Sequence, residues 1–551
     1  MTKKQRKARR RHLRAVFHRN ANRSVVARKT WETRRERHSS TGSTIQSTNT
    51  QGGTIIAQEK LFQRKLTLQE MEQTLWGAAD ILRGAIRPER YGNYVLPLLF
   101  FKRLSDVYVE EYNELMKKYR SEGIARKKFH RFLIPEGCLW GDIRRQSQNV
   151  GQKLNEVLAQ IAKSNPQLEG VINRVDFNKQ DELPQDRLIR LVEHFSQVQL
   201  GNANVEADIL GNVYEYMLKK FNEEAPQRAG EFYTPREVVR AMIGILDPEE
   251  GYEIYDPCCG SGGMLIVSHY HLANKGKDPK KLFLYGQEIN VDTWSIAMMN
   301  VMLHDMEAEI HQGDTLADPK VLDGSALKKF DMVVANPMWN QDGYKQLMES
   351  DRFGRFVYGI ASDSSADWGW IQHMLASLKP SGRMGIVLDQ GALFRGGAEG
   401  DIRRKVLEDD LVECVVALPE KIFYNTGAPG CLIFLNKNKH KERKGKVLFI
   451  YAAKGFDKLK NMNRLRDEDV EKLLKTHKEF KDVAKYAQVV ALDKIKENDY
   501  NLSVTRYVDV FDEDEPVDVA QVWQDLKKLE IERTKIDERV KAYLKELGYE
   551  Q

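Results

Sequence analysis

The stretch that decides the fold, residues 253–263, reads EIYDPCCGSGG. A short apolar run ends in Asp256, and three glycines follow within the next seven residues. Glycines at the carboxyl end of a strand let a ligand approach the backbone, and a helix that begins there points its amides at that ligand. Such a turn is a phosphate cradle or merely a tight turn. Because the Lys-Ser/Thr pair of a Walker loop is absent and the acid precedes the glycines, Asp256 favours a cationic ligand over a pyrophosphate.

Around this turn, short apolar runs alternate with helical patterns. The alternation predicts an α/β fold with a mostly parallel sheet and helices on both of its faces. The later runs are joined by shorter connections, which favours antiparallel strands at one edge. We expect strands over 253–255, 282–286, 332–335, 384–388, 412–418, 432–435 and 447–451, and helices over 293–304 and 368–378.

Two further acids follow strands or turns of this domain. Glu288 ends the second expected strand, where a carboxylate can accept both hydroxyls of a ribose. The alternative is an acid near the N-terminus of a helix, which is common. Asp314 follows a short turn-rich segment and could accept a hydrogen bond from an adenine exocyclic amine. Neither acid is specific when it is taken alone.

The fourth signal is Asn336-Pro337-Met338-Trp339, which follows the apolar run FDMVVA. It places an amide oxygen, a rigid turn and a large ring at the carboxyl edge of the sheet, where open parallel sheets bind ligands. The oxygen of Asn336 and a neighbouring carbonyl can together accept two bonds from an exocyclic amine, and the ring of Trp339 can stack on a base. An Asn-Pro pair alone usually marks a turn. Four signals in this order on these elements reinforce one another.

These motifs resemble those of the modification subunits (HsdM) of type I restriction–modification systems, within the N6-adenine DNA methyltransferases. The resemblance runs from about Leu66 to the end of the chain. It is carried by LWGAAD and YVLPLLF at residues 75–80 and 94–100, GEFYTPR at 230–236, DPCCGSGG at 256–263, and YNLS and RY at 500–503 and 506–507.

The resemblance implies a Rossmann-like domain that transfers a methyl group from S-adenosylmethionine to N6 of a flipped adenine. Glu288 would take the cofactor's ribose hydroxyls, and Asp314 its adenine amine. Asn336 and the Pro337 carbonyl would hold the target amine, and Trp339 would stack on the target base. No metal is expected. The other cofactor-binding residues would be Glu231, Phe232, Tyr233, Thr234, Pro235, Arg236, Asp256, Ser261, Gly262 and Gly263.

The resemblance also implies partners. These are double-stranded DNA, a separate specificity subunit and, in the larger complex, a restriction subunit, with two copies of this chain for each specificity subunit. The sequence is consistent with a separate specificity subunit. The catalytic sheet and its helices account for most of residues 199–510, which leaves no sizeable domain that could recognise bases. Residues 511–551 carry an apolar heptad pattern over about four repeats, broken only by Arg533, which favours a coiled-coil-like helix that docks a partner chain.

The chain before residue 199 divides into two parts. Residues 63–198 show helical periodicity and predict a helical N-terminal domain, in which Pro97 is expected to interrupt a helix. Residues 1–62 indicate a disordered basic arm and polar linker. Residues 1–38 hold 15 Lys or Arg and two acids, a net charge of +13, so the arm either neutralises DNA phosphates or is a solvated tail.

Composition excludes several other classes of protein. The 551 residues are 41% hydrophobic and 30% charged, as in an ordinary globular protein. No apolar run approaches the ~20 residues of a membrane-spanning helix, so a membrane protein is excluded. The five cysteines lack paired zinc spacing. Since no secretory signal is evident either, we expect a cytoplasmic protein without a structural metal.

Three other hypotheses use the same motifs. Pro257-Cys258 superficially resembles the nucleophile of cytosine-C5 methyltransferases. It lies, however, inside the glycine turn at residues 256–263, which is expected to bind the cofactor. A protein N5-glutamine methyltransferase would use the Asn-Pro turn to hold an amide, although the helical domain and the C-terminal helix argue against it. The family motif usually reads Asn-Pro-Pro followed by Phe or Tyr, and this chain has Met338 and Trp339 instead. Met338 is the sole support for an inactive scaffold that only clamps DNA.

Overall fold

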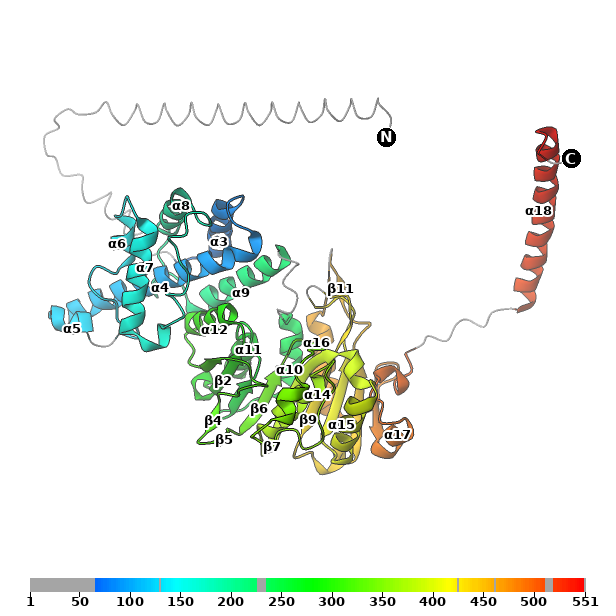
Figure 1. The fold of residues 1–551 in the computed structure, drawn as a ribbon. Coiled ribbons are helices and arrows are strands. Elements are labelled where there is room, and N and C mark those ends of the chain that lie inside the picture. Colours follow the sequence, from blue (N-terminus) through cyan, green and yellow to red (C-terminus); the bar gives the residue numbers. More distant parts are fainter. Residues whose placement is uncertain are drawn as a thin grey trace. The chain divides into compact units, whose positions relative to one another are not determined.

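The computed structural model describes residues 65–127, 130–224, 234–423, 426–459, 462–510 and 519–549 (Figure 1). The predictions for the basic arm and for Glu231, Phe232 and Tyr233 lie outside these residues. Contacts divide the chain into Met1–Arg64 and a second unit, Lys65–Gln551, which contains all the described helices and strands. Among the described helices, none combines the length and apolar character that crossing a membrane requires.

Amphipathic helices build the first part of this unit, as predicted. Thr67 caps α3 and exchanges hydrogen bonds with Glu70, which satisfies amides that the helix leaves unpaired. None of the described residues before Glu253 forms a strand of the sheet. The helices are α3 (Leu68–Leu82), α4 (Tyr91–Tyr119), α5 (Glu122–Lys127), α6 (Trp140–Arg144), α7 (Val150–Ser164), α8 (Gln185–Phe195) and α9 (Ala207–Glu224).

The predicted interruption at Pro97 is wrong, because α4 continues through this residue to Tyr119. A proline inside a helix removes one backbone hydrogen bond and costs about 3 kcal/mol. Every residue from Tyr94 to Phe101 is buried around it. Burial of this many apolar side chains outweighs the loss of one bond, since each contributes about 1.5–3 kcal/mol.

The helical core extends beyond residue 198. Leu210, Tyr214 and Met217 of α9 are buried in one cluster with side chains of α3 and α4. Met299 and Leu303, which lie on α12 (Val291–Leu303) of the following part, belong to the same cluster. The helical part and the sheet therefore share buried side chains, and the domain boundary at residue 198 remains a prediction.

A nine-stranded mixed sheet forms the second part (Figure 1). Its strand order is β13-β10-β8-β9-β7-β6-β1-β2-β3. All seven expected strands are confirmed, whereas β3 and β13 were not predicted. The strands are β1 (Glu253–Asp256), β2 (Phe283–Glu288), β3 (Glu309–Gln312), β6 (Phe330–Ala335), β7 (Leu378–Asp389), β8 (Val412–Ala417), β9 (Gly430–Asn436), β10 (Lys446–Tyr451) and β13 (Ala487–Ala491).

Most strands of the sheet run parallel, but the expected place of the antiparallel strands is only partly correct. The edge strand β13 is antiparallel to β10. The other antiparallel strand, β9, lies inside the sheet, where it pairs with β7 on one side and β8 on the other. After α15 the chain enters β8 one position away from β7, and the returning strand β9 fills the vacant position between them.

Helices cover both faces of the sheet, as predicted. On β6, Met332 and Val334 point into a cluster with the helices of one face, and Val333 and Ala335 into a cluster with those of the other. The expected helix 368–378 ends too late, because Leu378 already begins β7. The first face carries α10 (Arg236–Leu246), α11 (Gly263–Asn274), α12 and α16 (Asp467–Glu479), and the second carries α14 (Asp367–Ala376) and α15 (Gly397–Glu408).

Short elements complete the connections. These are α13 (Lys345–Glu349), α17 (Leu492–Glu497), β4 (Leu322–Asp323), β5 (Ala326–Leu327), β11 (Asp457–Lys458), β12 (Asn463–Arg464), η1 (Pro88–Arg90), η2 (Pro166–Leu168), η3 (Pro279–Lys281), η4 (Gln390–Leu393), η5 (Lys441–Arg443) and η6 (Val504–Arg506).

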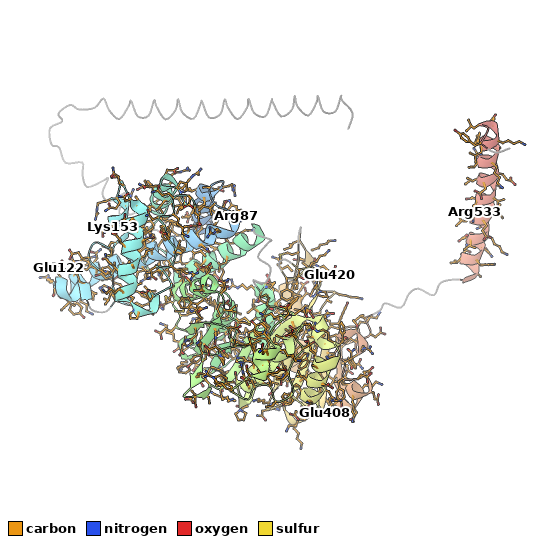
Figure 2. All side chains as sticks on the ribbon, in the orientation of Figure 1. Arg87, Glu122, Lys153, Glu408, Glu420 and Arg533 are labelled. Atoms are coloured by element: carbon orange, nitrogen blue, oxygen red, sulfur yellow. The ribbon has the colours of Figure 1, made fainter. Side chains whose placement is uncertain are left out.

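The predicted C-terminal helix is α18 (Val519–Glu546). Its large heptad side chains are 44–70% exposed, although they are apolar. Figure 2 shows its side chains standing out along the helix, with Arg533, the charged member of the series, labelled. A single helix cannot bury such a stripe by itself, so the stripe fits a partner helix. The exposed heptad residues are Val522, Leu526, Leu529, Ile536, Val540, Tyr543 and Leu547.

Candidate active site

A cavity of about 1520 Å³, including its open mouth, lies at the carboxyl ends of β1, β2, β3 and β6. Parallel sheets bind ligands at this edge. Four predicted residues that the structure describes are not part of the wall, namely Pro235, Gly262, Pro337 and Trp339. The structure brings the other described ones together around the cavity: Thr234, Arg236, Asp256, Ser261, Gly263, Glu288, Asp314 and Asn336.

The glycine turn after β1 needs its glycines for their backbone conformation. Gly260 and Gly262 have φ values of +53° and +81°, in the left-handed region that side chains disfavour. Gly262 is the N-cap of α11, and a Cβ there would also lie 3.5 Å from Val301. The turn thereby leads directly into a helix whose first amides border the cavity.

Glu288 ties the end of β2 to this turn. One oxygen of its carboxylate accepts the amide of Gly260 at 2.9 Å, and the other accepts the amide of Asn290 at 2.8 Å. The side chain that caps α12 is that of Asn290, so Glu288 lies near the N-terminus of this helix without being its cap. Each carboxylate oxygen has a second lone pair, so Glu288 can still accept hydroxyl groups from a ligand in the cavity.

Asp256 is buried at the base of the turn. The amide of Cys258 donates to its Oδ1 at 3.2 Å. Burial, with a smaller contribution from the nearby Glu288 charge, raises the pKa of Asp256 to about 8. The carboxyl is therefore largely protonated at neutral pH, and a cation bound in the cavity would favour its ionised form.

Asp314 lies in the turn that follows β3. Its Oδ1 accepts the amides of Leu316 and Ala317 at 3.0 and 3.2 Å. Its Oδ2 accepts the hydroxyl of Tyr344 at 3.0 Å. The backbone and one tyrosine thus fix this carboxylate at the wall of the cavity.

The amide of Asn336 is oriented from both ends. Its Nδ2 donates to Oγ1 of Thr234 at 2.8 Å. The indole Nε1 of Trp339 donates to its Oδ1 at 3.2 Å. Because an indole N–H can only donate, the atom that it meets must be the carbonyl oxygen, which fixes the direction of the amide.

Trp339 packs against a second aromatic ring. Its ring lies edge-on to Phe423, with 4.9 Å between centroids and an interplanar angle of 78°. A Cβ on Gly430 would come within 2.4 Å of Phe423 and 3.2 Å of Trp339, so both rings fit only beside a glycine. The neighbouring Met338 lines the cavity and is 41% exposed.

A buried charged cluster supports the loop behind Asn336. The amide of Asn340 donates to Oδ1 of Asp367 at 3.0 Å, and Arg395 donates to Oδ1 of Asn340 at 2.7 Å. Arg395 also pairs with Asp367, Asp389 and Glu399. No motif in the sequence points to Arg395, which reaches this loop from the segment between η4 and α15.

The wall also contains residues that sequence analysis missed. Some of them belong to the motifs around Asp256, Asp314 and Asn336, although no role was assigned to them. The others come from the helical part, from α10 to α12, from α14 and from the loops after β2 and β6, so only the fold brings them to the cavity. The missed residues are Gly92, Asn93, Glu215, Leu218, Val239, Pro257, Cys258, Cys259, Gly260, Met264, Val267, Ile289, Thr293, Ile296, Gly313, Thr315, Met338, Gln341, Tyr344 and Trp370.

Comparison with known proteins decides which family this site belongs to. The model of the N-6 DNA methylase family matches residues 205–516. The chain belongs to this family. The model of the HsdM N-terminal domain matches residues 71–195. Membership implies that this methylase uses S-adenosylmethionine.

The methylase resembles named relatives over most of its length. It is 38% identical to the type I restriction enzyme MjaVIII methylase subunit of Methanocaldococcus jannaschii, over 88% of this chain and 86% of that protein. It is 32% identical to the HindI methylase subunit of Haemophilus influenzae, over 75% of this chain and 95% of the relative. A type I restriction-modification system methyltransferase subunit from Streptococcus thermophilus has a similar structure, with a TM-score of 0.70, 31% identity, and coverage of 81% of this chain and 100% of that one.

These findings confirm the main functional prediction. The chain is an adenine-specific N6 DNA methyltransferase, the modification subunit of a type I restriction–modification system. A domain of the N-6 DNA methylase family, preceded by an HsdM N-terminal domain, favours DNA over a protein glutamine as its substrate.

The methylase offers no cysteine nucleophile at this site. Burial raises the pKa of the Cys258 and Cys259 thiols well above their ordinary value, which disfavours the thiolate. His304 is a buried core residue whose Nδ1 lies 2.7 Å from the hydroxyl of Tyr270. Among the described residues, no three His, Cys, Asp or Glu side chains converge as metal ligands would.

Proposed function

We propose that the cavity binds S-adenosylmethionine across the ends of β1, β2 and β3. The fit rests on a glycine turn that opens a helix, followed by one acid after each of the next two strands. Glu288 accepts the ribose hydroxyls and Asp314 the adenine amine, while Ser261 and Gly263 border the methionine part and Gly262, between them, shapes the turn. The residues predicted at Glu231, Phe232 and Tyr233 would complete this site. When bound, the cofactor supplies a methyl group already activated by its sulfonium.

The target amine is held at the end of β6. The observation that carries this proposal is the fixed amide of Asn336, whose nitrogen faces Thr234 and whose oxygen faces Trp339. A target amine that displaces the indole N–H would donate to this oxygen, and a second hydrogen would reach the Pro337 carbonyl. Two acceptors draw the amine nitrogen toward a nucleophilic geometry and orient it for transfer. Trp339 stacks on the adenine, which must leave the duplex to reach this depth.

An Asn336→Ala variant tests this assignment. Without the amide oxygen, the complex should still bind DNA and cofactor but should lose N6-methyladenine formation by at least about 100-fold, as when one oriented acceptor or donor is removed from a reacting group. Product is measured by mass spectrometry of digested DNA. Methylation by wild type but not by the variant would exclude the inactive scaffold. Methyl transfer to a protein glutamine with no DNA product would favour the glutamine methyltransferase instead.

We also propose that α18 docks the specificity subunit, in a cytoplasmic complex that contains double-stranded DNA, a restriction subunit and two copies of this chain. The support is the exposed heptad stripe, which a partner helix would bury. Leu529→Glu places a charge on the stripe and should abolish co-purification with a co-expressed specificity subunit. Thr534→Glu adds the same charge off the stripe and should leave co-purification unchanged. Equal retention of both variants would contradict this interface.

A further inference from the structure

One carboxylate at the wall of the cavity comes from the helical part. Glu215 lies on α9, whose Tyr214 and Met217 are buried in the helical core. Only 6% of Glu215 is exposed, and it lines the cavity. The neighbouring Leu218 and, from α4, Asn93 also line it. The helical part therefore supplies one side of the proposed cofactor site.

The charge of Glu215 is incompletely compensated within the described part of the chain. Nη1 of Arg236 lies 3.6 Å from its Oε2, beyond a normal hydrogen bond. Nε2 of His304 lies 3.9 Å from its Oε1, and burial lowers the pKa of this histidine to about 3, so it is neutral. Burial raises the pKa of Glu215, and only the Arg236 charge opposes this. A buried carboxylate in this setting is stabilised by a cation that hydrogen-bonds to it.

The contacts of Thr234 and Arg236 place Glu215 near the Asn336 end of the cavity. Asp314 follows β3 and Asn336 follows β6, with β1 and β2 between these strands. A ligand whose adenosine lies at Glu288 and Asp314 directs its other end past the glycine turn, toward Asn336. Thr234 contacts Asn336 there, and Arg236 follows Thr234 by two residues at the beginning of α10.

We propose that Glu215 binds the α-ammonium group of the methionine part of S-adenosylmethionine, with Arg236 facing its α-carboxylate. This inference rests on the cofactor site proposed above. An amino acid end carries both charges on one carbon, and the Glu215–Arg236 pair presents the two complementary charges side by side. The guanidinium of Arg236, which also donates to Asn212 at 3.1 Å, retains further N–H groups for a carboxylate.

The test compares two ligands on the full-length protein by isothermal titration calorimetry. S-adenosylhomocysteine carries the ammonium and carboxylate, whereas methylthioadenosine has the same nucleoside without either group. Glu215→Gln keeps the shape of the side chain and removes its charge. It should weaken binding of S-adenosylhomocysteine about 30-fold or more, as the loss of one partner of a buried charge pair does. Binding of methylthioadenosine should change by less than about twofold, which also shows that the variant is folded.

Two outcomes would overturn this role for Glu215. An unchanged affinity of Glu215→Gln for S-adenosylhomocysteine would show that Glu215 does not contact the ammonium group. An equal loss for both ligands would mean that Glu215 only packs α9 against α10. The wild-type protein provides a measurement that needs no variant: a deaminated S-adenosylhomocysteine should bind on the order of 10-fold or more weakly, and equal binding would also refute the contact. If wild type bound none of these nucleosides, the proposed cofactor site itself would fail, which is a distinguishable result.

Discussion

Replacing Thr234 with Val should slow methyl transfer much more than it weakens cofactor binding. Valine has nearly the same shape as threonine but offers no acceptor, so Nδ2 of Asn336 would face a methyl group where it now donates at 2.8 Å. Leaving a buried donor unsatisfied costs about 1–3 kcal/mol. Because this bond is only partly buried, we take the lower part of that range, about 1–2 kcal/mol, which corresponds to about a 5- to 30-fold lower kcat.

The assay is single-turnover methylation of a duplex by the assembled complex at saturating cofactor. Thr234→Ser is the matched control, because its hydroxyl can still accept from Asn336 and should restore most of the rate. The Kd of S-adenosylhomocysteine should stay within about twofold of wild type in both variants, since neither loses a charge. A Thr234→Val rate equal to wild type, or a Ser variant as slow as the Val variant, would refute the orienting role of Thr234.

Three further perturbations test other parts of the site. Trp339→Ala should lower DNA-dependent turnover about 5- to 100-fold, because stacking on the base is lost. Trp339→Phe keeps a ring but has no indole N–H, and its turnover should remain within about fivefold of wild type. Equal losses in the two variants would contradict stacking. The pKa of Asp256 is raised to about 8, so the unliganded protein loses stability as the pH rises from about 4 to 8, where the folded state binds more protons than the unfolded chain. Asp256→Asn should therefore gain unfolding free energy over wild type by about 1 kcal/mol or more between pH 5 and pH 8 in urea titrations, and a constant difference would rule this out. Arg395→Met leaves buried carboxylates unpaired and should lower the unfolding free energy by about 2 kcal/mol or more. Arg404→Met, on the helix that follows Arg395 and in an exposed pair with Asp401, should cost less than about 0.5 kcal/mol; similar values for the two would contradict the buried cluster.

The motifs at strand ends were predictable because each is a local pattern. An apolar run followed by glycine, acid or Asn-Pro marks a strand and the turn after it, and a parallel sheet then brings those ends to one edge. Asp314 lies at the predicted edge of the sheet, although the sequence EIHQ of β3 mixes polar and apolar residues and did not predict a strand. Its position depends on the neighbouring strand β2, which pairs with β3 in parallel.

The features that were missed depend on contacts distant in sequence. The continuous apolar run of β9 indicates a strand that is buried on both faces. Such a run does not show whether the neighbouring strands are parallel or antiparallel, so the interior antiparallel position of β9 was not predictable. Glu215 and Arg395 show the same limitation for single residues. Glu215 is an ordinary charged residue on a helix and Arg395 one in a connecting segment, and only the fold brings them to the cavity and to the loop behind Asn336.

Helix α12 limits how domains can be exchanged between related methylases. Ala297 and Val301 are buried with the sheet, and Met299 and Leu303 are buried with the helical part. The same helix is capped by Asn290, two residues after Glu288. A chimera that joins the catalytic half of this protein to the helical half of another would mismatch these side chains at the helix that follows Glu288. Exchange between related genes should therefore give folded protein when the helical part and the catalytic part are transferred together. An exchange whose junction lies between these two parts should give an insoluble protein.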